Sequence, residues 1–287
     1  MKKEIKLIAF DLDGTVLDRG RDITDATAQA LTKAHGHGCV LAVATGRGTD
    51  SIPPGIMNHP AVDYIISANG GVLSERASGK VLSVCGIKRE IVYDIIKTAH
   101  KHGAGMEVFF ADKSYYELRC LRAMIRYSRI MMSEGNNAWR EMDSFLEFIR
   151  AINIILSARR LVKRRSDAVV KLVALFKKRE AFERALDNFV AGGRVEAAST
   201  MGTDLEITAK NVTKGGTIAM LCEMLDIEKD AVIAFGDSGN DLSMREFVGT
   251  FIAMGNAGDD VKAVADRIAP SVSDDGVASM LHEIFGW

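Results

Sequence analysis

Two carboxylates lie two residues apart near the start of the chain, in the segment Asp11-Leu-Asp-Gly-Thr15. One carboxylate can attack phosphorus, and a second one close by can give and take protons. Carboxylates also suit Mg²⁺, which proteins bind through one or two such groups together with substrate phosphates. The neighbouring glycine and threonine offer backbone N–H groups and a hydroxyl for phosphate oxygens. The segment therefore indicates magnesium-assisted chemistry at phosphorus.

Five residues alone are also compatible with an ordinary polar turn or with part of a calcium loop, because short motifs have many chance matches. An EF-hand needs a helix before its loop and a Glu at the twelfth loop position. Counted from Asp11, the twelfth position is Asp22, and an apolar run typical of a strand precedes the loop. The EF-hand is therefore disfavoured, whereas the polar turn stays open on these residues alone.

Three further polar segments stand where apolar runs end or helices begin. Residues 45–48 read Thr-Gly-Arg-Gly after the apolar run 39–44, and residues 236–241 read Gly-Asp-Ser-Gly-Asn-Asp after the run 231–235. Lys214 stands where a helix is expected to open. Each segment alone has an ordinary explanation as a turn, a cap or a solvated lysine.

The positions of these segments relative to the expected strands indicate that they could form one site. Ligands of open α/β sheets bind outside the carboxyl ends of the strands, which is where the segments fall. A single site would then hold carboxylates for a metal, Lys214 to offset phosphate charge, and the Thr45 hydroxyl for a phosphoryl oxygen.

The first part of the chain alternates strands and helices. Residues 5–10, 39–44 and 62–67 are expected to form buried strands, since they are short apolar runs ended by turn residues. A helix over residues 24–35 is expected between the first two, with Thr24 as its N-cap and Gly36 or Gly38 at its end. This is the βαβ pattern of a doubly wound sheet. Residues 72–73 and 81–84 are expected to form a hairpin that leads away from this core.

The middle of the chain mixes helices with antiparallel strands, which predicts a separate α+β domain. Helices are expected at 87–102, around 120–132 and 141–150, and at 179–190. Strands are expected at 106–110, 115–118, 169–176, 194–199 and 204–208.

The α/β alternation resumes at Lys210, with a helix over 212–225, strands at 231–235 and 250–253, a further helix between these two strands, and two helices at the end of the chain. We therefore predict an α/β fold, a doubly wound Rossmann-like parallel sheet core formed by residues 1–85 and 209–287. Residues 86–208 form an inserted α+β cap in this interpretation.

Composition is that of a globular protein, with 287 residues, 47% of them hydrophobic and 26% charged. The net charge of −1 hides an asymmetry, because residues 86–208 carry a net charge of +6 and the remainder −7. A positive lid over a carboxylate-lined base fits this distribution. Nucleic acid is not expected as a partner, since the middle segment has no recognisable nucleic-acid-binding motif. The basic run 159–165 is expected to be a solvated loop or helix face, with contact to an acidic substrate or a membrane surface as the alternative.

The four cysteines have no C-x-x-C spacing. Cys39, Cys85 and Cys222 fall in apolar runs, which favours buried free thiols over disulfides or a zinc site. No signal peptide is expected at the N-terminus, and no apolar run reaches the roughly 18–20 residues of a membrane span. These features predict a cytoplasmic protein with no membrane partner.

The ordered set of motifs DLDGT, ATGR, TKGG and GDSGND resembles the haloacid dehalogenase-like (HAD) hydrolase superfamily. It is specifically similar to the Cof-type phosphatases, which carry a large α+β cap between the second and third motifs. The segment SANGG at 67–71 and the strand LEIT at 205–208 also fit that subfamily. The motifs are specific in the core and say little about the cap.

The resemblance implies a role for each motif residue. Asp11 would be the nucleophile, and Asp13 the general acid and then the base. Asp237 would bind Mg²⁺ together with the Asp11 carboxylate and the Asp13 backbone carbonyl, while Asp241 would orient the water shell of the metal or Lys214. The implied catalytic residues are Asp11, Asp13 and Lys214; those binding phosphate are Leu12, Thr45, Gly46, Arg47, Asn69, Lys214 and Asn240; those at the metal are Asp11, Asp13, Asp237 and Asp241.

The expected function is a Mg²⁺-dependent phosphatase that forms an aspartyl-phosphate intermediate. Its substrate would be a small phosphorylated metabolite, such as a sugar phosphate, a nucleotide or a phosphorylated cofactor. Asp13 favours this over dehalogenation, because it can protonate an alcohol leaving group. A phosphotransferase similar to phosphomannomutase and a catalytically silent metabolite-binding protein are the alternatives.

Overall fold

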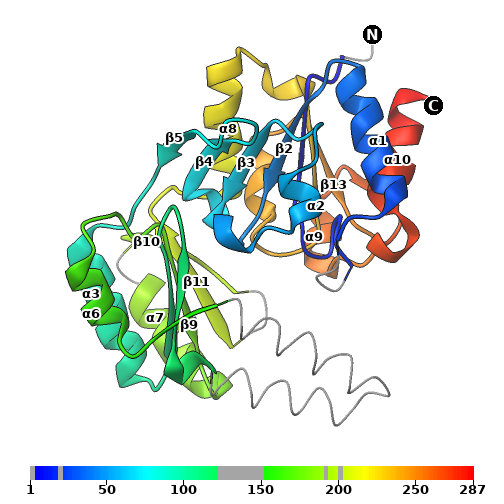
Figure 1. Ribbon diagram of the computed structural model, residues 1–287. Helices are drawn as coiled ribbons and strands as arrows, with labels where there is room; N and C mark the ends of the chain where they lie inside the picture. Colours follow the sequence, from blue (N-terminus) through cyan, green and yellow to red (C-terminus); the bar gives the residue numbers. More distant parts are fainter. Residues whose placement is uncertain (1–3, 19–21, 122–151, 191–192, 200–202) are drawn as a thin grey trace, which may run out of the picture. The chain divides into compact units, whose positions relative to one another are not determined.

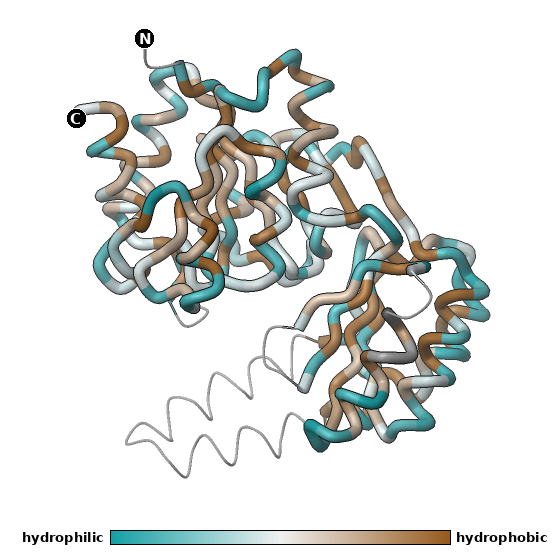
Figure 2. Tube along the Cα trace, turned by 180° about the vertical axis from the view of Figure 1, so that it is seen from behind, coloured by the Kyte–Doolittle hydropathy of each residue, from teal (hydrophilic) through white to brown (hydrophobic). Residues whose placement is uncertain are grey.

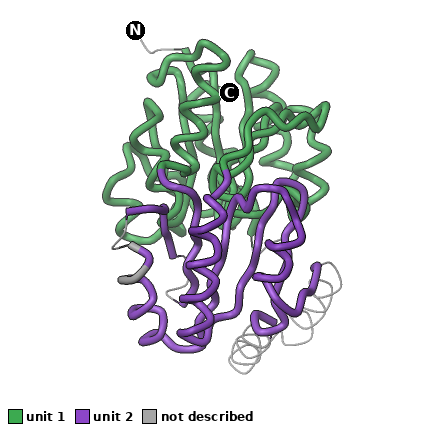
Figure 3. Tube along the Cα trace, turned by 90° about the vertical axis from the view of Figure 1, so that its left-hand side faces the viewer, with its two compact units in different colours: residues 1–85, 211–287 green, residues 86–210 purple. Residues whose placement is uncertain are grey.

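The computed structural model describes residues 4–18, 22–121, 152–190, 193–199 and 203–287 (Figure 1). These residues divide into two compact units, residues 1–85 with 211–287 and residues 86–210 (Figure 3). The helix expected at 141–150 and most of the one expected at 120–132 lie outside the described residues. In each unit the apolar residues follow the strands, and the polar residues gather on the outer faces of the helices (Figure 2).

The described part of unit 1 is built on an eight-stranded sheet in the order β14-β13-β12-β1-β2-β3-β4-β5. The strands from β14 to β3 are parallel, whereas β4 and β5 are antiparallel additions. The first strand, β1, lies in the middle of the sheet; β2 to β5 extend the sheet on one side of it, and β12 to β14 extend it on the other. The strand order therefore reverses beside β1. The strands are β1 Leu7–Phe10, β2 Val40–Ala44, β3 Tyr64–Ser67, β4 Val72–Glu75, β5 Val81–Val84, β12 Val232–Gly236, β13 Thr250–Ala253 and β14 Arg267–Ile268.

Helices cover both faces of this sheet. Side chains alternate along a strand, so β1 sends Ile8 and Phe10 into one hydrophobic cluster, with α1 and α10, and Leu7 and Ala9 into another, with α8. The sheet is therefore buried on both sides, as expected from its apolar strands. The helices are α1 Asp25–Gly36, α2 Pro54–Met57, α8 Lys214–Leu225, α9 Asp259–Val264 and α10 Gly276–Phe285; short 3₁₀ helices are η1 Thr49–Ser51, η2 Ala68–Gly70, η3 Lys229–Ala231, η4 Leu242–Glu246 and η5 Val272–Asp274.

Side-chain caps fix the starts of two of these helices. The Thr24 hydroxyl accepts the N–H of Thr27 at 3.2 Å, which confirms Thr24 as the N-cap of α1. The Thr213 hydroxyl accepts the N–H of Gly216 at 3.0 Å and so places Lys214 at the first position of α8. Each cap satisfies an N–H group that the first helical turn leaves unpaired.

One expectation for unit 1 was wrong. The hairpin of β4 and β5 does not lead away from the core, because β4 pairs antiparallel with β3 and extends the sheet. The helix expected after Asn240 is the 3₁₀ helix η4, and the short strand β14 was not expected.

The described part of unit 2 is a six-stranded sheet in the order β10-β11-β9-β6-β7-β8. Neighbouring strands are antiparallel except β7 and β8, and β8 was not expected. The helices α3, α6 and α7 share one hydrophobic cluster with alternate residues of the strands, which gives the α+β arrangement. The strands are β6 Gly105–Phe109, β7 Ser114–Glu117, β8 Asn153–Ile155, β9 Lys171–Leu175, β10 Val195–Ala198 and β11 Asp204–Ala209; the helices are α3 Arg89–Lys101, α6 Ala158–Arg164 and α7 Arg179–Val190.

The basic run 159–165 is only partly solvated. Most of it forms α6, which buries Val162 in the core of the unit. At its end, the Arg165 guanidinium stacks 4.3 Å from the centroid of the Phe110 ring and donates to the Tyr115 hydroxyl at 2.9 Å. The run therefore anchors a helix to the sheet, in addition to presenting charge to water.

All four cysteines are free thiols, as expected. Cys39, Cys120 and Cys222 are buried, whereas Cys85 is only half-buried, because it lies at the end of unit 1 rather than in its core. Among the described helices, none combines the length and the apolar character needed to cross a bilayer.

Candidate active site

The carboxyl ends of three adjacent parallel strands bring the predicted residues together. Asp11 follows β1, Thr45 follows β2 and Asp237 follows β12. The pairing continues one residue past β1, since the N–H of Asp11 donates to the carbonyl of Phe235 at 3.0 Å. This edge lies where the strand order reverses, which is the usual ligand position in open α/β sheets.

A buried ion-pair network forms the centre of the site. The Lys214 ammonium donates to Oδ1 of Asp11 and to Oδ1 of Asp241, each at 2.7 Å. Burial by itself would lower the pKa of Lys214, but the adjacent Asp11 and Asp241 more than reverse this and raise it. Lys214 therefore stays charged and fixes the Asp11 carboxylate beside the sheet edge.

Asp241 fixes the conformation of the loop after β12. Its Oδ2 accepts the backbone N–H groups of Asp237 and Ser238, both at 3.0 Å, and its side chain is fully buried. A Cβ on Gly236 would lie 2.5 Å from the Asp241 Cβ, so glycine is needed for this close approach. Protein donors thus occupy both Asp241 oxygens, which fits the expected role of orienting Lys214; direct metal binding by Asp241 stays a prediction.

The chemistry of the remaining oxygens fits a hard cation. Asp11, Asp237 and Asp241 each offer a carboxylate oxygen within 4.8 Å of the others. The buried Oδ1 of Asp237 has no hydrogen-bond partner among the described residues, and none of them donates to Oδ2 of Asp11. Carboxylate oxygens left free in this way are the ligands that Mg²⁺ and Ca²⁺ prefer.

The electrostatics of the cluster also favour a cation. Burial raises the pKa of Asp11 to about 8, an effect that Lys214 opposes and Asp241 adds to. Burial together with the charge of Asp241 raises the pKa of Asp237 to about 7. One lysine therefore does not neutralise the three carboxylates, and a bound cation would stabilise their ionised forms.

Gly14 gives the Asp237 carboxylate its space. Its φ of +78° is a conformation that favours glycine, and a Cβ there would lie 2.2 Å from Oδ2 of Asp237. The glycine of the DLDGT motif is therefore explained by packing against the acidic cluster.

Asp13 lies apart from the buried cluster and is paired with Arg47. Its side chain is 51% exposed, and its two oxygens accept from Nε and Nη2 of Arg47 at 2.8 and 2.6 Å. The third guanidinium nitrogen, Nη1, donates to the carbonyl of Ser51 at 2.8 Å. The structure thus pairs the Arg47 side chain with Asp13, and a contact of Arg47 with phosphate stays a prediction.

The other predicted phosphate-binding residues lie around the same edge. The fully buried Thr45 hydroxyl accepts the N–H of Arg47 at 3.1 Å, with Gly46 between them in the loop. The Asn240 amide donates to Oδ1 of Asn69 at 3.2 Å, so these two side chains meet from distant segments. Leu12 is different: its side chain is fully buried in the core, so only its backbone is available to a ligand.

The Thr15 hydroxyl, which was expected to serve phosphate oxygens, is buried and has no hydrogen-bond partner among the described residues. Two residues near the site were missed by the sequence reasoning. Ser238 donates from its backbone N–H to Asp241. Asn256 donates to the carbonyl of Gly14 at 2.8 Å and so ties the loop after β13 to the Asp11 loop. The Gly-Asn-Ala-Gly sequence after an expected strand was the signal for Asn256, since it falls at the same sheet edge.

A family model described as haloacid dehalogenase-like hydrolase matches residues 8–281. The chain belongs to this family. Phosphatase YwpJ of Bacillus subtilis (strain 168) is 25% identical to the chain over 295 residues, which cover 98% of the chain and 100% of the relative. HMP-PP phosphatase of Yersinia pestis (strain Pestoides F) is 26% identical over 280 residues, which cover 96% of the chain and 94% of the relative.

Solved structures of HAD proteins agree with the fold. A haloacid dehalogenase-like hydrolase from B. subtilis superposes with a TM-score of 0.85 at 26% identity, over 96% of the chain and 99% of the neighbour. The HAD subclass IIB sugar phosphatase BT4131 superposes with a TM-score of 0.77 at 23% identity, over 98% and 99%, and supports the fold. The resemblance to HAD hydrolases of the Cof type and the predicted core-and-cap fold class are thereby confirmed, and the chain is an HAD-type phosphoric monoester hydrolase.

Proposed function

We propose that this HAD hydrolase is a Mg²⁺-dependent phosphatase that acts on small phosphorylated metabolites through an aspartyl-phosphate intermediate. The observation that carries the proposal is the state of Asp11. Lys214 holds one of its oxygens at 2.7 Å, while the other oxygen accepts no hydrogen bond from the described residues. A carboxylate fixed in this way is oriented for attack, and Asp13 follows it by two residues.

The reaction has two steps. In the first, one carboxylate oxygen of Asp11 attacks phosphorus, the bond between phosphorus and the ester oxygen breaks, and Asp13 gives its proton to the departing alcohol. In the second, Asp13 takes a proton from water, and this water attacks the phosphorus of the aspartyl phosphate. The bond between phosphorus and the Asp11 oxygen breaks, inorganic phosphate leaves, Asp11 is again a carboxylate and Asp13 is again protonated.

Residues around Asp11 stabilise the charge on the phosphoryl group. Lys214 supplies a fixed positive charge in a buried site, where such charges act more strongly than in water. Asp11, Asp237 and the carbonyl of Asp13 would hold Mg²⁺, which supplies further positive charge at the phosphoryl oxygens. The Thr45 hydroxyl and the backbone N–H groups of its loop would bind those oxygens.

The relatives suggest the class of substrate. Two of them are named for specific phosphorylated metabolites: HMP-PP phosphatase, and 5-amino-6-(5-phospho-D-ribitylamino)uracil phosphatase YwtE of B. subtilis, 26% identical over 98% of the chain. Sugar phosphates and nucleotides have the same monoester chemistry, and unit 2, as an inserted cap, would choose among them. Four free thiols suit a reducing compartment, so we place the enzyme in the cytoplasm.

The first test measures phosphate released from a panel of phosphorylated metabolites, with Mg²⁺ and with EDTA. We expect release only with Mg²⁺, and we expect Asp11→Asn to abolish it, because losing the nucleophile costs many orders of magnitude in rate. Asp25→Asn, which changes an exposed carboxylate on α1, is the matched control and should keep wild-type rates. An isomeric sugar phosphate in place of inorganic phosphate would instead identify a phosphotransferase. A folded protein that binds the metabolites without converting them would be a binding protein.

A second test looks for the intermediate. Enzyme quenched in acid during turnover should carry one phosphoryl group on the peptide that contains Asp11, as measured by mass spectrometry. Phosphate found on another residue, or on none under conditions of rapid turnover, would exclude the covalent route through Asp11.

A further inference from the structure

The chain passes from β3 to β4 through three consecutive residues with positive φ angles, Ala68 at +52°, Asn69 at +56° and Gly70 at +98°. This left-handed region suits glycine, whereas a Cβ makes it unfavourable, more so for alanine than for asparagine. All three residues are buried. Strain of this kind persists only where the surrounding structure enforces it, and it clusters at functional sites. The contacts of the turn 68–70 therefore indicate what it does.

Backbone hydrogen bonds hold the turn against the loop after β2. The N–H of Ala68 donates to the carbonyl of Arg47 at 2.8 Å, and the N–H of Asn69 donates to the carbonyl of Thr45 at 3.0 Å. These carbonyls belong to the loop whose hydroxyl and N–H groups are proposed to bind phosphoryl oxygens. The turn therefore fixes the conformation of that loop from behind.

The turn also contacts the start of α8, which carries Lys214. The Thr217 hydroxyl donates to the carbonyl of Gly70 at 2.9 Å. A Cβ on Gly70 would lie 2.3 Å from the carbonyl oxygen of Thr213, the N-cap residue of α8. Glycine at position 70 thus allows α8 to begin directly against the turn, and Lys214 is the first residue of that helix.

The Asn69 side chain reaches the loop after β12. Its Oδ1 accepts from Nδ2 of Asn240 at 3.2 Å, and Oδ1 of Asn240 accepts from the Ser238 hydroxyl at 2.8 Å. The Asn240 carboxamide is thus held at both ends, with the second hydrogen of its Nδ2 left for a ligand. In the sheet, β2 and β1 lie between β3 and β12, so this contact links segments on either side of the strands that lead to Thr45 and Asp11.

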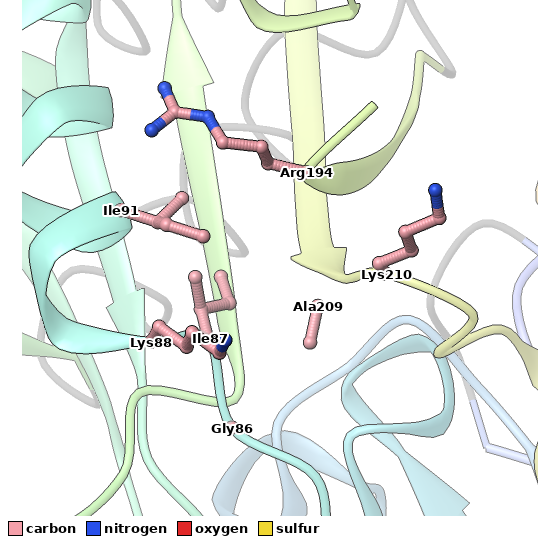
Figure 4. Close-up of a pocket in the computed structure, with 7 residues that line it drawn as sticks. All are labelled: Gly86, Ile87, Lys88, Ile91, Arg194, Ala209 and Lys210. Atoms are coloured by element: carbon pink, nitrogen blue, oxygen red, sulfur yellow. The ribbon is translucent and has the colours of Figure 1, made fainter. Parts of the chain in front are cut away.

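This convergence of polar groups distinguishes the turn from a pocket of about 390 Å³ in unit 2. The head groups of Lys88, Arg194 and Lys210, which line that pocket, point away from one another (Figure 4). They present no common point of charge to a phosphoryl group. Groups that hold the phosphoryl group are therefore expected in unit 1, around the turn.

We propose that the turn 68–70 positions the phosphoryl-binding groups, and that Asn69 acts by orienting Asn240 rather than by binding phosphate itself. The inference rests on the proposed function, with Thr45, Lys214 and Asn240 as the groups that contact the phosphoryl group. Each of these residues belongs to a segment that the turn contacts. Groups held in place before the reaction stabilise the transition state without reorganising during it.

The first test compares kcat for p-nitrophenyl phosphate among variants of the full-length protein with Mg²⁺. Asn69→Gly keeps the left-handed backbone and removes the carboxamide, so we expect kcat to fall about tenfold or more. Asn69→Asp keeps an acceptor oxygen for Asn240 and should retain more activity than Asn69→Gly. The opposite order would overturn the proposal, because a carboxylate in place of a phosphate-binding amide would repel the substrate. Asp226→Gly, an exposed left-handed residue at the far end of α8, is the control and should keep wild-type rates.

A double-mutant cycle tests whether Asn69 acts through its partner. If it does, Asn69→Gly combined with Asn240→Ala should have the kcat/KM of Asn240→Ala alone, within about twofold. Losses that multiply in the double variant would show that the two residues act independently, and would overturn the proposal.

A third measurement does not depend on turnover. In ¹⁵N NMR spectra without substrate, Asn69→Gly should shift the side-chain amide signals of Asn240 and the backbone amide signals of residues 45–47 and 213–217, whereas Asp226→Gly should not. Unchanged signals in Asn69→Gly would overturn the positioning role. A wild-type protein that releases no phosphate from any ester would instead refute the proposed function, and the spectra would still decide whether Asn69 holds Asn240 in place.

Discussion

At the scale of single residues, the partner of each carboxylate decides what it can do. Asp11 is held by Lys214 and Asp13 by Arg47, although the two carboxylates are neighbours in the sequence. All three nitrogens of the Arg47 guanidinium donate to Asp13 or to Ser51. We therefore interpret Arg47 as a positioning residue for Asp13, the proposed general acid and base.

This interpretation predicts a dependence on the leaving group. Arg47→Lys cannot reproduce the paired contact, because lysine has no planar fork of donors. We expect kcat to fall by about 10-fold or more for an alkyl phosphate, whose alcohol needs a proton to leave, and much less for p-nitrophenyl phosphate. Arg245→Gln, which breaks an ion pair outside the site, is the control. Equal losses on both substrates with a raised KM would show that Arg47 binds phosphate after all.

A second residue-scale prediction concerns the metal. Asp237→Ala removes one of a few anionic oxygens available to a hard cation, so we expect Mg²⁺ binding, measured by calorimetry, to weaken by about tenfold or more. Asp260→Asn, an exposed carboxylate on α9, is the matched control. An unchanged Mg²⁺ titration for Asp237→Ala would remove this residue from the metal site.

At the scale of elements, the sheet of unit 2 buries an unusual carboxyl group. Glu107 of β6 and Glu206 of β11 flank Val173 of β9 in register, so all three point to the same face. Burial raises the pKa of Glu107 to about 8. The positive charge of Lys171 opposes this rise, and the negative charge of Glu206 adds to it. Its hydrogen bond among the described residues comes from the thiol of Cys120 at 3.9 Å, which does little to stabilise an ionised form.

The raised pKa predicts how stability changes with pH. Between the ordinary value of 4.5 and about 8, Glu107 is protonated in the folded state and ionised in the unfolded state. Folding then takes up a proton in this pH range. The contribution of protonated Glu107 to the free energy of unfolding is complete below pH 4.5, falls by up to about 1.4 kcal/mol per pH unit above it, and is lost by about pH 8. Glu107→Gln should flatten this slope, as measured by chemical unfolding at several pH values. The exposed Glu90→Gln should keep it, and an identical slope in all three proteins would contradict the assignment.

At the scale of the whole molecule, each unit has its own interior. Two hydrophobic clusters lie within residues 1–85 and 211–287, and a third lies within residues 86–210. Regions with separate cores can fold and unfold separately. We propose that the second unit is an inserted cap whose role is to select the substrate.

This division predicts the result of removing the cap. A short Gly/Ser linker in place of residues 86–210 should leave a folded core that binds Mg²⁺ and hydrolyses p-nitrophenyl phosphate weakly. We expect discrimination among metabolites to disappear, because binding energy from the rest of the substrate and the exclusion of water are lost. Calorimetry of the full chain should show one more unfolding transition than calorimetry of the truncated core. A truncated protein as selective as the full chain would place specificity in the core.

Local patterns were enough to predict the framework of the site. Short apolar runs ending in Asp11, Thr45 and Asp237 predicted parallel strands, and the carboxyl ends of parallel strands share one edge. The hydroxyl of Thr24 before a helical pattern predicted a cap, because capping needs only residues three positions apart. These features depend on neighbours along the chain, so the amino-acid sequence by itself determined them.

Only the tertiary structure decided which groups pair across the site and how far the sheet extends. Arg47 meets Asp13 across 34 residues, and Lys214 meets Asp11 across 203. The strand β4 joins the core sheet by pairing antiparallel with β3, and Val72 and Leu73, which point to opposite faces of the sheet, are both buried there. Such pairings depend on side-chain direction and strand register, which are set only when distant segments pack together.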